Sequence, residues 1–308
     1  MTEKKEIEEI IRKAQKISIY ALNELCKKLN LDSKAVLSNL PNLRFGNMKQ
    51  TSIGEYYPES NEIVLKNKII NIISKSLKEH QESKENVKEW YIMEIAETII
   101  HETIHSLRTI NRKGNEIDNL YLSRILLDLE FNEHEIDNEE RPRTVCYILP
   151  DKTTDEIENL MTEGNENDIY DIINGYQEQI NLQEGLEECL TEGLAQIALK
   201  NLLHKRPLEE TYGEIINDPK TRLDTLIGVK IFQNLDEEMI KWFLTTRLNP
   251  NYENLIEEEY KDDYLKLLKV ASGAYSEVVN SNVDEKLKNS TLEKLDEIIE
   301  SRSHKKTI

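Results

Sequence analysis

The sequence predicts a mostly helical α+β protein with a small antiparallel sheet and a helical C-terminal part. Two observations favour this fold class. Apolar residues recur at helical spacing through most of the chain, as in the stripe Leu223, Leu226, Ile227 and Ile231. Residues 53–65 instead combine Gly, Pro and β-branched residues in a pattern typical of a hairpin. The 308 residues have 38% hydrophobic content, and their periodicity makes a core possible.

The elements follow from these patterns in order. Helical periodicity covers residues 3–29, 66–82, 86–110, 182–204, 211–217, 220–234, 236–248, 252–271 and 283–300. Shorter helices are predicted after Asp32, which can serve as an N-cap, and near 120–129 and 168–180. Residues 53–57 and 62–65 flank a turn and form the predicted hairpin, and residues 144–149 are strand-like.

Charge and composition exclude several classes of protein. The net charge of −19 repels nucleic acid and anionic membranes, so neither is expected as a partner. No apolar run approaches the length of a transmembrane helix, and the N-terminus does not read as a signal peptide. The three scattered cysteines, Cys26, Cys146 and Cys189, argue against a disulfide framework. A cytoplasmic protein is therefore expected.

The strongest chemical signal is His101-Glu102-Thr103-Ile104-His105, an H-E-x-x-H pattern within an apolar helical segment. Residues four apart lie on one face of a helix, so His101 and His105 can bind one Zn²⁺. Glu102 projects beside them, where a carboxylate can take a proton from an attacking water. This is the equipment of a metallopeptidase.

A catalytic zinc needs a third protein ligand. A histidine six residues after His105 would supply it in one class of peptidase, but that position is Asn111. The better candidates are Glu184, Glu188 and Glu192, which stand one helical turn apart beside apolar residues. Like charges stacked in this way repel one another, and a cation would offset the repulsion.

The H-E-x-x-H pattern, followed on a later helix by Glu188-Cys189-Leu190-Thr191-Glu192, resembles the gluzincins, the thermolysin-like clan of zinc peptidases. The resemblance implies a zincin-like fold with Glu188 as the third zinc ligand. It also implies that Glu192 orients a zinc-bound imidazole. Another gluzincin pattern, E-G-x-A, matches Glu192-Gly193-Leu194-Ala195 and would make Glu192 the ligand instead.

The resemblance also predicts where a substrate would bind and which residue would stabilise the oxyanion. The hairpin before the H-E-x-x-H helix is similar to the gluzincin active-site sheet, whose edge strand binds an extended peptide. Gluzincins often stabilise the oxyanion with a Tyr or His after the second helix. Tyr212 is the candidate here, with Tyr260 and Tyr264 as alternatives.

These observations predict a zinc-dependent endopeptidase or aminopeptidase that acts on a peptide or protein substrate. Residues 1–114 would hold the N-terminal helices, the hairpin and the H-E-x-x-H helix. Residues 115–205 would add an insertion and the third-ligand helix to the same catalytic domain, and residues 206–308 a helical subdomain.

Two alternatives remain open. One is a non-catalytic zinc-binding or regulatory module with a gluzincin-like fold. The other is a different metal hydrolase, because Glu188-Cys189-Leu190 weakly resembles part of the peptide deformylase motif.

Overall fold

The computed structural model describes residues 3–38, 40–46, 53–57, 60–108, 166–204, 206–235, 237–245, 256 and 259–305. The chain divides into two compact units. The first joins Met1–Arg108 to Cys189–Ile256, and the second joins Thr109–Glu188 to Glu257–Ile308. The boundary falls inside one continuous helix, between Glu188 and Cys189. The three-part division expected from the sequence stays a prediction.

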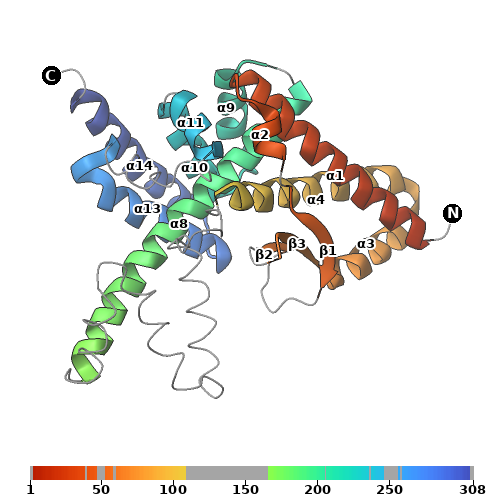
Figure 1. Ribbon diagram of the computed structural model, residues 1–308, viewed down its shortest axis with the longest axis horizontal. Helices are drawn as coiled ribbons and strands as arrows, with labels where there is room; N and C mark the ends of the chain where they lie inside the picture. Colours follow the sequence, from red (N-terminus) through yellow and green to blue (C-terminus); the bar gives the residue numbers. More distant parts are fainter. Residues whose placement is uncertain are drawn as a thin grey trace. The chain divides into compact units, whose positions relative to one another are not determined.

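The fold is mostly helical with a small sheet, as the periodicity predicts (Figure 1). The helices are α1 (Glu3–Lys28), α2 (Ser33–Leu37), α3 (Asn67–Glu79), α4 (Lys84–Arg108), α8 (Glu166–His204), α9 (Leu208–Asn217), α10 (Leu223–Asn234), α11 (Glu237–Thr245), α13 (Tyr264–Val279) and α14 (Glu285–Lys305). Short 3-10 turns lie at η1 (Gln81–Ser83) and η3 (Lys261–Asp263). Asp32 caps α2, as expected, by accepting a hydrogen bond from the Lys34 backbone N–H.

The sheet corrects one prediction. The predicted hairpin is present, because β2 (Gly54–Tyr57) pairs antiparallel with β3 (Glu62–Lys66). However, β1 (Asn42–Gly46) adds to the other side of β3 in parallel, so the sheet is mixed rather than antiparallel, in the order β1-β3-β2. The sequence did not reveal β1 because most of its side chains are at least partly exposed, so it lacks a buried apolar alternation.

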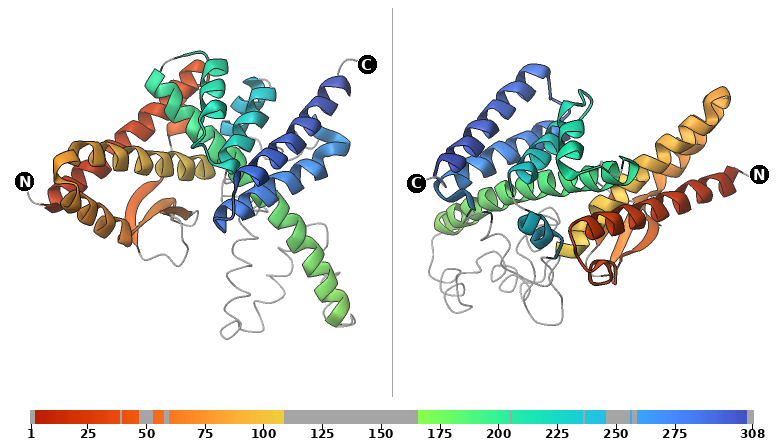
Figure 2. Two further views of the ribbon diagram at one scale, coloured as in Figure 1. Left: turned by 180° about the vertical axis from the view of Figure 1, so that it is seen from behind. Right: turned by 90° about the horizontal axis from the view of Figure 1, so that it is seen from above.

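The core of the first unit forms where α1 and α4 lie side by side (Figures 1 and 2). The two helices run in the same direction, since Lys84 binds Glu6 near one end and the Ser18 hydroxyl donates to the Ala96 carbonyl further along. Their facing apolar residues are almost fully buried: Ala14, Ala21, Leu22 and Leu25 from α1, and Ile95, Ala96 and Ile100 from α4. Burial of this apolar surface holds the H-E-x-x-H helix in place.

Helix α8 packs against α10 at a very close distance. Gly193 of α8 and Gly228 of α10 face each other, and a Cβ on Gly193 would lie 2.7 Å from the Gly228 carbonyl carbon. A Cβ on Gly228 would overlap the Cys189 carbonyl oxygen. Only glycine permits this approach of two backbones, and it fixes the turn of α8 that contains Cys189 and Glu192.

The second unit includes α13 and α14, which are joined by polar contacts near one end. Asp263 accepts hydrogen bonds from Lys266, at 2.8 Å, and from Ser301, at 2.6 Å. Arg302 binds Glu259 and lies over the Tyr260 ring, with 5.5 Å between the guanidinium carbon and the ring centroid. These contacts join the residues just before α13 to the last turns of α14.

Helix boundaries differ from the sequence expectation in two places. The predicted helices 168–180 and 182–204 are one helix, α8, because Gly185 lies inside it against Ser272 and does not end it. The predicted helix 252–271 is interrupted by η3 before α13 begins at Tyr264, and of its residues before η3 the structure describes 256, 259 and 260, which are helical.

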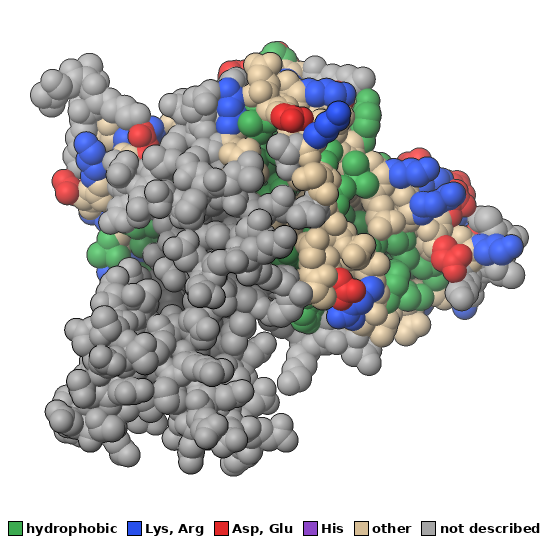
Figure 3. All heavy atoms as spheres, viewed as in Figure 1, with side chains coloured by type: hydrophobic (Ala, Val, Ile, Leu, Met, Phe, Trp, Pro, Cys, Tyr) green, Lys and Arg blue, Asp and Glu red, His purple; other side chains and the backbone are tan. Residues whose placement is uncertain are grey.

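Several predictions lie outside the described residues. They are the helix near 120–129, the strand-like segment 144–149 and part of the turn at 58–61. A search of the described helices for a membrane-crossing segment finds none. On the face that Figure 3 shows, Lys and Arg side chains of the first unit are interspersed with Asp and Glu side chains, and hydrophobic side chains lie between them.

The α8–α10 contact makes a prediction about two glycines. Gly228→Ala should lower the free energy of unfolding by about 3 kcal/mol, because the added methyl group overlaps backbone that cannot rotate away. Gly213 is the matched control, since a Cβ there meets nothing within 4 Å. Gly213→Ala should therefore raise the stability by about 1 kcal/mol through helix propensity. Urea denaturation followed by circular dichroism measures both, and equal effects would contradict the close packing.

Candidate metal centre

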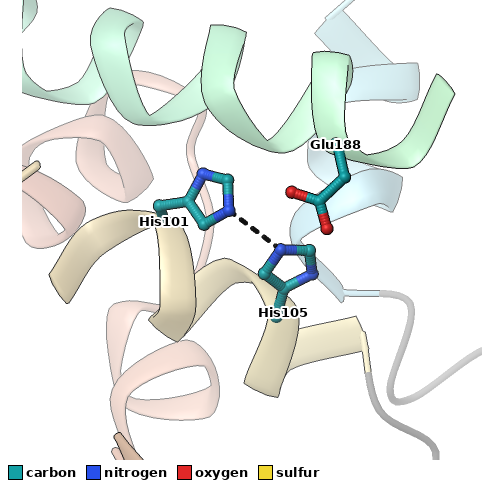
Figure 4. Close-up of side chains that lie close together, drawn as sticks. All are labelled: His101, His105 and Glu188. Atoms are coloured by element: carbon teal, nitrogen blue, oxygen red, sulfur yellow. Dashed lines mark hydrogen bonds between the residues drawn. The ribbon is translucent and has the colours of Figure 1, made fainter. Parts of the chain in front are cut away.

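Helices α4 and α8 bring two imidazoles and one carboxylate together. His101 and His105 come from successive turns of α4, and Glu188 comes from α8. One nitrogen or oxygen atom from each residue lies within 4.8 Å of the others, which makes this a group that could hold a metal ion. Figure 4 shows the three side chains pointing toward one another. Glu188 is buried, with 6% of its surface exposed.

The imidazole geometry fits a shared ion. The Nε2 atoms of His101 and His105 lie 3.0 Å apart, and the rings meet edge to face at an angle of 69°. This is hydrogen-bond distance, and two nitrogens bound tetrahedrally to one zinc at about 2.0–2.1 Å are slightly further apart, at roughly 3.3–3.4 Å. A small outward movement of the two rings would therefore place both Nε2 atoms around one ion.

Glu192 fixes the orientation of the first imidazole. Its Oε2 atom lies 2.8 Å from Nδ1 of His101, so this nitrogen is the donor and Nε2 is left to bind a metal. Burial by itself raises the pKa of Glu192, but the hydrogen bond from His101 and the charge of Arg222 oppose that effect. The result is a lowered pKa of Glu192. Glu192 therefore stays an anion at neutral pH.

Further side chains surround the Glu192 carboxylate. Gln196, one turn along α8, donates a hydrogen bond to Glu97 of α4, and Glu97 in turn hydrogen-bonds to Glu192. Arg222, at the start of α10, lies 3.9 Å from the other Glu192 oxygen and also pairs with Asp224. Burial, followed by the charge of Glu192, raises the pKa of Glu97 to about 8.

Glu102 lies against the sheet. It is 7% exposed, and its Oε2 atom accepts a hydrogen bond of 2.8 Å from the backbone N–H of Tyr56 in β2. Gly54 makes this approach possible, since a Cβ there would lie 2.6 Å from the Thr98 methyl group. The H-E-x-x-H helix and strand β2 are thus joined at the residue between the two histidines.

The predicted oxyanion stabilisers lie in α9 and in the second unit. Tyr212 is buried in α9 with 5% exposure, two residues before Glu214. Glu214 contacts Lys200 and His204, about three and four helical turns beyond Glu188 in α8. Tyr260 is buried, with no hydrogen-bond partner for its hydroxyl in the described structure, and Tyr264 begins α13. The role of Tyr212 remains a prediction.

Cys189, on which the deformylase alternative depends, is fully buried, and its backbone lies against Gly228. Its sulfur is not part of the metal-binding group found among the described residues.

Comparisons with protein-family models, with curated proteins and with solved structures find no match to this chain. The function of the protein is therefore inferred from its sequence pattern and the geometry of the site.

Three groups around the site were not expected from the sequence. Glu97 stands four residues before His101, so the helical spacing that identified His105 could also have found it. Arg222 and the Tyr56 backbone N–H carry no such signal, because their positions depend on how α10 and β2 meet the two site helices.

The arrangement predicts different consequences for the two candidate glutamates. Glu188→Ala should weaken zinc binding by more than about 100-fold because it removes a donor atom. Glu192→Ala should weaken it by about 10 to 100-fold because it only frees the His101 ring. The affinities can be measured by competition with a chromophoric chelator. Glu184→Ala, one turn earlier in α8, is the control, and a larger loss for Glu192→Ala than for Glu188→Ala would reverse the assignment.

Proposed function

We propose that this protein is a zinc metallopeptidase that hydrolyses a peptide bond. The observation that supports it most is the convergence of His101, His105 and Glu188, with Glu102, the residue that follows His101 in the same helix, held by strand β2. The sequence motifs resemble those of the gluzincins, which have a zincin-like fold, and this resemblance favours the same function. Zinc-dependent hydrolysis needs three protein ligands, an open coordination position and a nearby carboxylate base, and these residues supply the ligands and the base.

The donor set favours zinc. Two imidazole nitrogens and one carboxylate are a common set of protein ligands in catalytic zinc sites. The same donors can also bind Fe²⁺, but an oxygen-activating iron site does not need a carboxylate like that of Glu102 beside it. The hydrogen bond from His101 to Glu192 suits a zinc ligand, because a ligating imidazole usually gives its second N–H to a carboxylate.

The chain's own residues then have separate roles. A bound Zn²⁺ would supply Lewis acidity, which polarises the scissile carbonyl and acidifies the attacking water. Glu102 takes a proton from that water and passes it to the leaving amine. The Tyr56 N–H fixes one carboxylate oxygen of Glu102, so the side chain does not have to be ordered at the moment of reaction.

Strand β2 is the proposed binding site for a peptide substrate. Among the described residues it is an edge strand, in the order β1-β3-β2. The Ile53 carbonyl accepts a hydrogen bond from the Lys66 N–H of β3, whereas the Tyr56 N–H points to the opposite side and donates to Glu102. The Gly54 N–H and carbonyl therefore lie on the outer edge, where an extended peptide can pair with the strand beside the metal-binding group.

The general-base role predicts the effect of one substitution. Glu102→Gln should lower the rate of peptide cleavage by about 10² to 10⁴-fold because an amide cannot accept the proton. The zinc content should stay at that of the wild type, since Glu102 is not a ligand. A peptide library followed by mass spectrometry measures cleavage, and atomic absorption measures the metal.

The control outcomes separate this function from a non-catalytic zinc module. Stoichiometric zinc without cleavage by the wild type would reject the peptidase and leave a binding or regulatory module. Absence of zinc from wild-type protein purified without chelator, and after addition of Zn²⁺, would reject the site itself. Equal cleavage by the wild type and Glu102→Gln would reject Glu102 as the base.

The proposed oxyanion role of Tyr212 can be tested with matched variants. Tyr212→Phe removes only the hydroxyl and should lower kcat by about 10² to 10³-fold if that hydroxyl stabilises the transition state. The same change at Tyr260 and at Tyr264 provides the comparison. Steady-state kinetics on a cleaved peptide distinguishes them, and an unchanged kcat in Tyr212→Phe would remove this residue from the mechanism.

A further inference from the structure

We propose that Glu97 is a positioning residue for the metal centre, fixing the Glu192 carboxylate that orients His101. The inference rests on the metal site proposed above and adds a residue that contacts none of its three ligands in the hydrogen bonds described. It predicts that a change at Glu97 acts on metal affinity through Glu192.

The contacts form a ladder between two helices. His101 and Glu97 are one turn apart in α4, and Glu192 and Gln196 are one turn apart in α8. His101 donates to Glu192, Glu192 bonds to Glu97, and Gln196 donates to Glu97. The four side chains therefore alternate between the helices, and each central carboxyl group is held on two sides.

A hydrogen bond between two carboxyl groups requires a proton, because neither carboxylate can donate. Glu97 is the better place for it. Burial, followed by the charge of Glu192, raises the pKa of Glu97 to about 8, so Glu97 holds the proton at neutral pH. Glu97 thus donates to Glu192, and Glu192 accepts from both Glu97 and His101.

Arg222 explains why this support is needed. Its guanidinium lies 3.9 Å from the second oxygen of Glu192, and its side chain is 56% exposed. Without this support, Glu192 can turn toward the Arg222 guanidinium and leave Nδ1 of His101 without its acceptor. Glu97 opposes that rotation by holding the carboxylate from the α4 side, so the His101 ring keeps Nε2 directed at the metal position.

The test compares two substitutions at one residue. In Glu97→Gln, the side-chain amide can still donate to Glu192 and its oxygen can still accept from Gln196, so zinc affinity should stay within about 3-fold of the wild type. In Glu97→Ala the support is lost, and zinc affinity should fall by about 10-fold or more. Chelator competition measures both, and the visible spectrum of the Co²⁺-loaded protein reports the geometry of the ligands.

Glu94 provides the matched control. It lies in α4 one turn before Glu97, and burial and the charge of Glu192 raise its pKa as well. Glu94→Ala removes a similar carboxyl group from the same region, yet zinc affinity should remain within about 3-fold of the wild type. Thermal unfolding of the metal-free proteins shows whether any loss of affinity is a loss of fold, and Glu97→Gln keeps the test decisive if Glu97→Ala does not fold.

The outcomes separate this inference from the proposed function. Wild-type protein that binds no metal overturns both. Wild-type protein that binds zinc, with Glu97→Ala binding equally well, overturns the positioning role alone. Glu97→Gln binding as weakly as Glu97→Ala overturns it as well, because the charge of Glu97 and not its donated hydrogen bond would then matter. Retained affinity in Glu97→Gln with loss in Glu97→Ala supports it.

Discussion

The hydrogen bond between His101 and Glu192 is the interaction on which the candidate site depends. It joins α4 to α8 at 2.8 Å, and it selects which imidazole nitrogen is left for a metal. One turn before Glu192 on the same helix, Glu188 faces the two histidines. The contact that orients one candidate ligand thus also positions the helix that carries another, so a shift of α8 would affect both.

The surrounding packing holds these two helices at fixed positions. On one side, α4 is buried against α1 through apolar residues such as Ile95 and Ile100. On the other, the Gly193–Gly228 contact brings α8 close to α10, and α10 begins beside Arg222. A ligand set must be positioned to within fractions of an ångström, and such accuracy requires support of this kind.

Acidic side chains buried around the site differ from those on the surface, because burial disfavours their charged form. Glu97, Glu188 and Glu192 come from the two site helices, where desolvation disfavours several anions. The negative charge lies on Glu192, which is next to His101 and Arg222. The raised pKa of Glu97 keeps that second carboxyl group neutral. Burying carboxylates costs free energy, and this arrangement reduces that cost by sharing a proton and pairing the remaining charge.

The sequence by itself determined the features that depend on local spacing. The i, i+4 positions of His101 and His105, the Glu188–Glu192 turn, the helices and the β2–β3 hairpin all follow from periodicity, because neighbours on one helix or hairpin are near in sequence. Only the tertiary structure decided which glutamate faces the histidines, that β1 joins the sheet in parallel, and that Tyr56, Glu97 and Arg222 surround the site. These depend on how separate elements cross, and crossing is set by long-range packing that no local pattern contains.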